Sequence, residues 1–136
     1  MNILKELENI VSAYNEKYKA LTISQLMDAK AKMVTLLCNF ADEVAESKKD
    51  SLLTTVYRKY EHHKMKSQLI DENFTAALAE SKSVEAAKKI MEEETTCEHI
   101  AYLHKLKLQQ FNKVVEDITQ RISILRDDQN YHKSIN

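Results

Sequence analysis

Residues 97–125 read CEHIAYLHKLKLQQFNKVVEDITQRISIL, and a regular seam of mainly apolar or small side chains recurs along them at alternating intervals of four and three residues. Four successive heptads of this kind are typical of helices that pack side by side as coiled coils. The segment therefore predicts a long helix with one continuous packing seam. The seam positions are Cys97, Ala101, His104, Leu108, Phe111, Val115, Ile118, Ile122 and Leu125.

Around this seam we expect one helix over residues 83–128, followed by a polar tail over residues 129–136 that frays. At 1.5 Å per residue such a helix is longer than ~60 Å, so the shorter helices of the same chain cannot cover all of it. We therefore predict a homo-oligomer in which Ile118, Ile122 and Leu125 are buried between chains.

Upstream of this helix, the chain contains nearly the same phrase twice. NFADEVAESK occupies residues 39–48 and NFTAALAESK occupies residues 73–82. The offset of 34 residues matches the tetratricopeptide period, but the Trp, Gly and Pro of that repeat are absent and no third copy follows. We interpret the copies as two similar helix ends, with breaks at residues 48–50 and 81–83. One alternative stays open, in which the second break is too weak and the flanking helices fuse into one rod.

Three further helices are predicted before the seam, over residues 2–19, 23–47 and from 50 or 51 to 80. Thr22 and Gln25 have the spacing of a capping box, which marks a helix start after the break at residues 20–22. The third helix carries its own stripe, predicted to face the core: Leu53, Val56, Tyr60, His63, Ser67, Ile70, Phe74 and Ala77.

The composition agrees with an all-helical chain, because it has 0 Gly and 0 Pro among 136 residues. The absence of Gly excludes P-loops and glycine-rich dinucleotide sites. We expect an all-α fold: a four-helix bundle with a long C-terminal heptad-bearing helix, in one domain over residues 1–128. The net charge of −1, from 20 basic and 21 acidic residues, means that any nucleic-acid surface is local.

The cysteine and N-terminal patterns indicate an intracellular protein, and the histidine pattern favours a structural role over metal chemistry. Cys38 and Cys97 lie in apolar context and are expected to be reduced core residues. No basic and apolar leader opens the sequence, so we expect no signal peptide and no membrane span. A hairpin about Lys82 would bring His63 close to His104, where a polar layer that fixes register is favoured over zinc. We expect no enzyme activity, no metal and no cofactor.

Two basic runs offer a possible ligand surface. VYRKYEHHKMK, residues 56–66, and HKLKLQQFNK, residues 104–113, would lie at overlapping levels in the same hairpin. Lysine and arginine can bind phosphates while tyrosine rings stack on bases, which is how single-stranded nucleic acid is held without sequence preference. The predicted DNA-binding residues are Arg58, Lys59, Lys64, Lys66, Lys105, Lys107 and Tyr57.

The basic, aromatic third helix and the long C-terminal helix ending in QRISILRDD, residues 120–128, resemble the UvsY-like recombination mediators of phages. The resemblance covers residues 52–128 and is one of pattern. It implies a small oligomeric protein that binds single-stranded DNA and helps to load a recombinase, in the cytoplasm of a bacterial or phage-infected host cell. It would place DNA contacts on Arg58, Lys59, Lys64 and Lys66, and oligomer contacts on Ile118, Ile122 and Leu125.

Two classes of function therefore compete. The first is an oligomeric accessory protein that binds single-stranded DNA during recombination, with a recombinase or another protein as partner. The second is a structural or scaffolding helical module, of viral or other origin, that binds proteins only. The basic runs favour the first class, and the balanced net charge favours the second.

Overall fold

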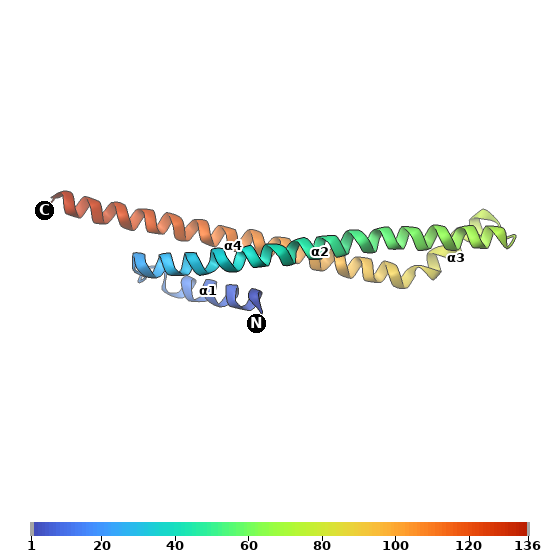
Figure 1. The fold of residues 1–136 in the computed structure, drawn as a ribbon, viewed down its shortest axis with the longest axis horizontal. Coiled ribbons are helices and arrows are strands. Elements are labelled where there is room, and N and C mark those ends of the chain that lie inside the picture. Colours follow the sequence, from blue (N-terminus) through green and yellow to red (C-terminus); the bar gives the residue numbers. More distant parts are fainter. Residues whose placement is uncertain (1, 136) are drawn as a thin grey trace. The chain divides into compact units, whose positions relative to one another are not determined.

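The computed structural model describes residues 2–135, and all of its regular structure is helical (Figure 1). The elements are α1 (Ile3–Lys17), α2 (Ile23–Asp71), α3 (Ala76–Ala86) and α4 (Lys88–Ile135). The predicted all-α class and the number of four helices are confirmed, although both breaks between the second, third and fourth helices lie elsewhere than predicted and the fourth helix extends further. Within residues 2–135, no helix combines the length and apolar character needed to cross a bilayer.

The helices form two compact units, a division that the prediction of one domain over residues 1–128 did not include. Unit 1 contains the chain up to Glu43 and from Lys105 onward, and unit 2 contains Val44–His104. Helices α2 and α4 each contribute residues to both units.

The start of the chain follows its sequence signals closely. The Asn2 side chain caps α1 by accepting hydrogen bonds from the backbone N–H groups of Leu4, at 3.0 Å, and Lys5, at 3.4 Å. The capping box before α2 is also confirmed. The Thr22 N–H donates to Gln25 Oε1 at 2.9 Å, and the Gln25 N–H donates to Thr22 Oγ1 at 3.2 Å.

The predicted break at residues 48–50 is wrong, because α2 continues without interruption to Asp71. Those residues are Lys, Lys and Asp, which are polar but neither Gly nor Pro, so they interrupt the apolar pattern without ending the helix. The first copy of the repeated phrase, residues 39–48, consequently lies inside α2 and closes no helix.

The chain reverses at Asn73, which has a φ of 69° in the left-handed region. The Phe74 N–H donates to the Leu69 carbonyl at 3.1 Å and the Asn73 N–H donates to the Ile70 carbonyl at 3.0 Å, as in a Schellman motif. Thr75 then caps α3 by accepting from the Leu78 N–H at 3.3 Å. The second copy of the phrase therefore contains a helix-to-helix turn and opens α3, which corrects the interpretation that it closes a helix.

The joint between α3 and α4 is a single residue, Ala87, with φ −82° and ψ −3°. The break predicted at residues 81–83 falls inside α3 and is therefore misplaced. At the other end, α4 is helical to Ile135, so residues 129–135 continue the helix where a frayed tail was predicted.

Unit 1 contains the large buried side chains of the protein. Phe40 from α2 meets Phe111 from α4 edge to face, with ring centroids 6.1 Å apart. The Tyr14 hydroxyl of α1 donates a hydrogen bond to Asp117 of α4. The buried residues of this unit are Leu7, Tyr14, Leu26, Met33, Leu37, Phe40, Phe111, Ile118 and Ile122. The predicted α4 seam is buried or half-buried at every position, so the 3–4 spacing identified the packed face of that helix.

Candidate interaction surface

The two basic runs lie in different units. Arg58, Lys59, Lys64, Lys66 and Tyr57 belong to α2 in unit 2, whereas Lys105 and Lys107 belong to α4 in unit 1. The prediction that they form one basic patch depended on a hairpin about Lys82, with His63 opposite His104.

That register is wrong because the chain turns at Asn73. His104 instead lies against Ser47, with 2.7 Å between Nδ1 and Oγ, and His63 is exposed.

The basic run of α2 faces acidic residues of the same unit. Arg58 forms a salt bridge with Glu94, and both side chains are largely covered. Lys66 Nζ lies 2.8 Å from Glu80 Oε2, while His62 Nε2 lies 3.1 Å from Glu80 Oε1. The hydrogen bond from Lys66 is the main cause that holds the pKa of Glu80 below its usual value. Arg58 and Lys66 are therefore partly neutralised by residues of their own chain.

Of the other residues predicted to contact DNA, one is paired with an acidic residue and four are exposed. Lys107 Nζ lies 3.2 Å from Glu8 Oε1 of α1. Lys59, Lys64 and Lys105 are exposed and form no ion pair within the part of the chain that the structure describes. Tyr57 is exposed as well, so a ligand can reach its ring.

The histidines and cysteines do not assemble a metal centre. Among residues 2–135, no three His, Cys, Asp or Glu side chains are grouped as metal ligands. The half-buried Cys97 accepts a weak hydrogen bond from Thr54 Oγ1 at 3.7 Å. Cys38 is exposed, where a core position was predicted, because the buried face of α2 passes through Leu37 and Phe40 on either side of it.

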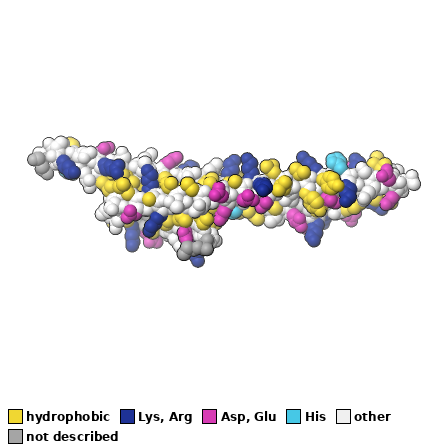
Figure 2. Space-filling view, in the orientation of Figure 1, with side chains coloured by type: hydrophobic (Ala, Val, Ile, Leu, Met, Phe, Trp, Pro, Cys, Tyr) yellow, Lys and Arg dark blue, Asp and Glu magenta, His cyan; other side chains and the backbone are white. Residues whose placement is uncertain are grey.

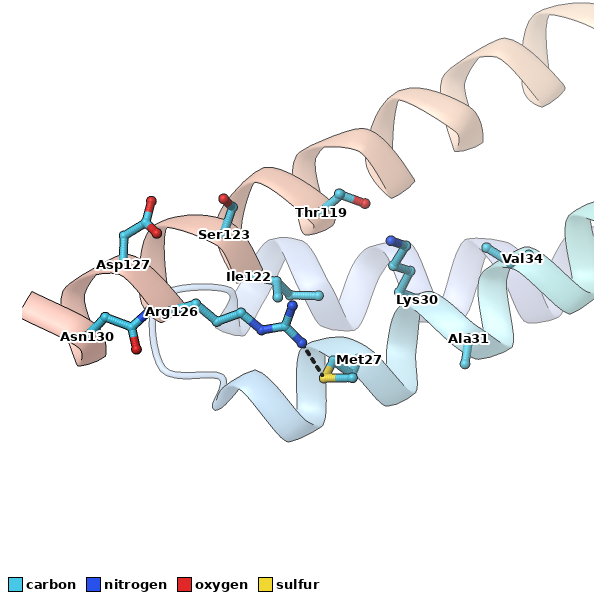
Figure 3. Close-up of a pocket in the computed structure, with 10 residues that line it drawn as sticks. All are labelled: Met27, Lys30, Ala31, Val34, Thr119, Ile122, Ser123, Arg126, Asp127 and Asn130. Carbon is cyan, nitrogen blue, oxygen red and sulfur yellow. Dashed lines mark hydrogen bonds between the residues drawn. The ribbon is translucent and has the colours of Figure 1, made fainter. Parts of the chain in front are cut away.

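The residues predicted to lie between chains are placed in the core of unit 1. Ile118 is fully buried, Ile122 is nearly so, and Leu125 is half-buried, each within a single chain. Ile122 also reaches a groove between α2 and α4 (Figure 3), where Arg126 Nη2 donates to Met27 Sδ at 3.5 Å. Since these side chains are already covered, the apolar surface available to a partner lies elsewhere.

Unit 2 carries a contiguous group of exposed apolar side chains on α2. Five large side chains on the outer side of this helix are each more than half exposed: Leu52, Leu53, Val56, Tyr57 and Tyr60. We call this group the α2 face. Figure 2 shows hydrophobic side chains gathered on the surface of this unit. Leu53, Val56 and Tyr60 belong to the stripe that the sequence predicted to be core, so that prediction is wrong for the single chain.

The α2 face is exposed because the opposite side of the helix makes the contacts within unit 2. Ser47, Thr54 and Arg58 contact His104, Cys97 and Glu94 of α4, and His62 contacts Glu80 of α3. These partners are polar, so a search for apolar periodicity does not detect the packed side.

Unit 2 also lacks a core of large side chains. Its buried residues within the described chain are Ala79, Ser83 and Ala87. They recur every four residues along one side of α3 and its joint with α4, where small side chains allow helices to approach closely. Half-buried side chains such as Met65, Leu69 and Ile90 complete the packing. The unit therefore buries little of its apolar surface, and the α2 face is its largest unburied group.

No family model, curated protein or solved structure matches this chain.

Proposed function

We propose that this chain is a non-enzymatic, self-assembling helical scaffold in which a second copy covers the α2 face. The observation that carries the proposal is the contrast within unit 2, whose buried residues are two alanines and a serine while five large side chains on α2 stay exposed. Contiguous exposed apolar groups of this size mark interaction sites, and their 3–4 spacing along α2 suits packing against another helix.

The test replaces two side chains at the centre of the α2 face, Val56→Glu with Tyr60→Glu. Glutamate is a good helix former, so α2 should keep its helicity while its apolar face gains charge. We expect the dimer dissociation constant to rise at least ~10-fold, because burying one valine side chain is worth ~1.5 kcal/mol or more. Light scattering across a concentration series measures this change.

Tyr102→Glu is the matched control, because Tyr102 is equally exposed in unit 2 but lies on α4. It should leave assembly unchanged. A wild-type chain that is monomeric at micromolar concentration would contradict the proposal, as would an assembly that is unaffected by the paired substitution.

A second candidate function is single-stranded DNA binding in recombination, the role that the resemblance to UvsY-like mediators implies. It is supported by Lys59 and Lys64, which are exposed and form no ion pair in residues 2–135, and by the exposed Tyr57 ring on the same helix. Cations that reach phosphates and a ring that stacks on bases are the elements of such a site. Since both candidates use α2 in unit 2, DNA and a second copy would compete for overlapping surface.

Titration of labelled single-stranded DNA at two salt concentrations tests this candidate. Binding should weaken as salt rises, because phosphate contacts release counterions. Lys59→Ala with Lys64→Ala should weaken binding and flatten the salt slope by about 2. Lys133→Ala, an exposed lysine of α4 in unit 1, is the control. Absence of binding at low salt would refute DNA recognition.

A further inference from the structure

We propose that the second copy lies antiparallel along the α2 face, with Lys64 of each chain beside Asp50 of the other. This inference rests on the self-assembly proposed above and adds the direction and the charge contacts of the pairing. It follows from how charges are distributed along α2 in unit 2.

On the flank of the α2 face that carries Tyr57, the exposed charges are acidic before the face and basic beyond it, whereas Lys48 and Lys49, which also precede the face, lie off this flank. Glu46 and Asp50 precede the face, whereas Lys59 and Lys64 lie within and beyond it. All four side chains are exposed, and within residues 2–135 none of them belongs to an ion pair. These charges are therefore available to a partner.

Asp50 and Lys64 also lie on the same side of the apolar stripe. They are separated by about four turns of helix, and so project in nearly the same direction from α2. Tyr57 stands midway between them in the sequence.

An antiparallel copy centred near Tyr57 pairs the charges at both ends of the α2 face at once. A twofold axis exchanges the acidic end of one chain with the basic end of the other, and it keeps the same flank of the stripe together. Asp50 then meets Lys64 of the partner subunit twice, once on each side of the axis. The same arrangement packs Val56 near its own equivalent and Leu53 beside Tyr60 of the partner subunit.

A parallel copy in register is electrostatically unfavourable. Lys49 lies in line with Val56 and Tyr60 on the helix, and it would meet its own equivalent in the centre of the contact. Lys59 would approach Lys64 of the partner subunit on both flanks. Like charges in direct contact across an interface suppress such a pairing.

Spin labels on the full-length chain distinguish the two directions. Cys38→Ser and Cys97→Ser remove the native thiols, and Glu46→Cys or Gln68→Cys then provides one exposed labelling site. In an antiparallel pair centred at Tyr57, identical labels are separated by ~33 Å along the helices, from the rise of 1.5 Å per residue. A mixture of the two labelled chains should instead give a short distance, because Glu46 lies level with Gln68 of the partner subunit.

Charge exchange provides an independent measurement. Lys64→Glu alone and Asp50→Lys alone should each raise the dimer dissociation constant by about 10-fold, because each reverses two contacts per dimer. The double variant should restore assembly to within about 2-fold, since opposite charges meet again. Lys133→Glu, on α4 in unit 1, is the control and should change nothing.

The outcomes separate this inference from the function that it rests on. A dimer with short distances between identical labels, or a double variant that stays weak, overturns the antiparallel arrangement and leaves self-assembly intact. A chain that is monomeric throughout overturns both. A monomer that dimerises only with a different helical protein would show that the α2 face serves another partner.

Discussion

At the scale of single residues, the contact between Tyr14 and Asp117 joins α1 to α4 in unit 1. Tyr14 is buried, and its hydroxyl donates to the Asp117 carboxylate. Burial is the main cause that raises the pKa of Tyr14 above its ordinary value, and the hydrogen bond to Asp117 adds to it. The folded protein therefore holds the protonated phenol more strongly than the unfolded chain does.

Tyr14→Phe removes this hydrogen bond and should lower the free energy of unfolding by about 1 kcal/mol at neutral pH, because the exposed Asp117 regains water. The deficit should be constant below pH ~10 and shrink above it by ~1.4 kcal/mol per pH unit, since only the unfolded wild-type tyrosine then ionises. Urea unfolding from pH 7 to 11 measures both values. Tyr131→Phe, at an exposed position, should match wild type throughout. A deficit that stays constant at pH 11 would contradict the account.

Asn73 is the second residue with a position-specific role. It occupies the left-handed region in a chain with 0 Gly, and Asn is the residue that replaces Gly there most readily. The equivalent residue of the first phrase, Asn39, is exposed and helical within α2. The same residue type in the same local sequence therefore adopts two backbone conformations.

The paired positions make a direct test of this difference. At position 73, Gly should stabilise the protein by about 0.5 kcal/mol and Ala should destabilise it by about 1 kcal/mol, because only Gly accepts positive φ freely. At position 39, Ala should be the more stable by about 1 kcal/mol, because Gly is a poor helix former. Thermal unfolding followed by circular dichroism ranks the four variants, and an identical order at both positions would refute the assigned turn.

At the scale of elements, the sequence predicted α1, the capping box and the packed side of α4. It misplaced the helix boundaries within unit 2. Helix starts with a side-chain cap have a local signature, as at Thr22. The turn at Asn73 was missed because the same phrase occurs inside α2, so local sequence alone does not separate the two outcomes. Three residues of the α2 face were assigned to the core because the 3–4 spacing of apolar residues predicts that a stripe is buried. This spacing does not distinguish burial within the chain from burial against another chain.

The continuity of α2 predicts how it responds to proline. Lys48→Pro should destabilise the protein by ~3 kcal/mol or more, because position 48 is in the interior of the helix. Ala76→Pro is the matched control. Ala76 is the first residue of α3, and Thr75 before it has the extended backbone, with ψ 153°, that proline requires. It should be nearly neutral. Circular dichroism and urea unfolding measure both variants, and a tolerated proline at position 48 would place a helix break there after all.

At the scale of the whole molecule, the two units differ in how they are stabilised. Among residues 2–135, unit 1 has nine buried apolar side chains, whereas the buried positions of unit 2 are occupied by Ala79, Ser83 and Ala87. Large buried side chains supply most of the hydrophobic free energy of folding. Unit 2 should therefore open more readily when the α2 face is uncovered.

Hydrogen exchange across a dilution series tests this difference. Amide protection in residues 44–104 should fall as the protein is diluted below its dimer dissociation constant, because assembly stabilises by mass action. Protection in unit 1 around Leu37 and Phe111 should be independent of concentration. In the variant that combines Val56→Glu with Tyr60→Glu, amide protection in residues 44–104 should be low at every concentration. Equal protection of both units at all concentrations would contradict the proposed role of the second copy.

The reversal at Asn73 has a consequence for how this protein can change length. Within unit 2, Ser47 of α2 contacts His104 of α4, and Arg58 contacts Glu94. The two helices are therefore antiparallel arms of one hairpin, in which residue numbers rise along α2 as they fall along α4. An insertion or deletion in one arm alone would shift every later contact out of phase. Matched changes of seven residues in both arms preserve the phase, because seven residues are close to two helical turns. We expect length variants of this protein to differ by such paired increments, with the turn at Asn73 retained.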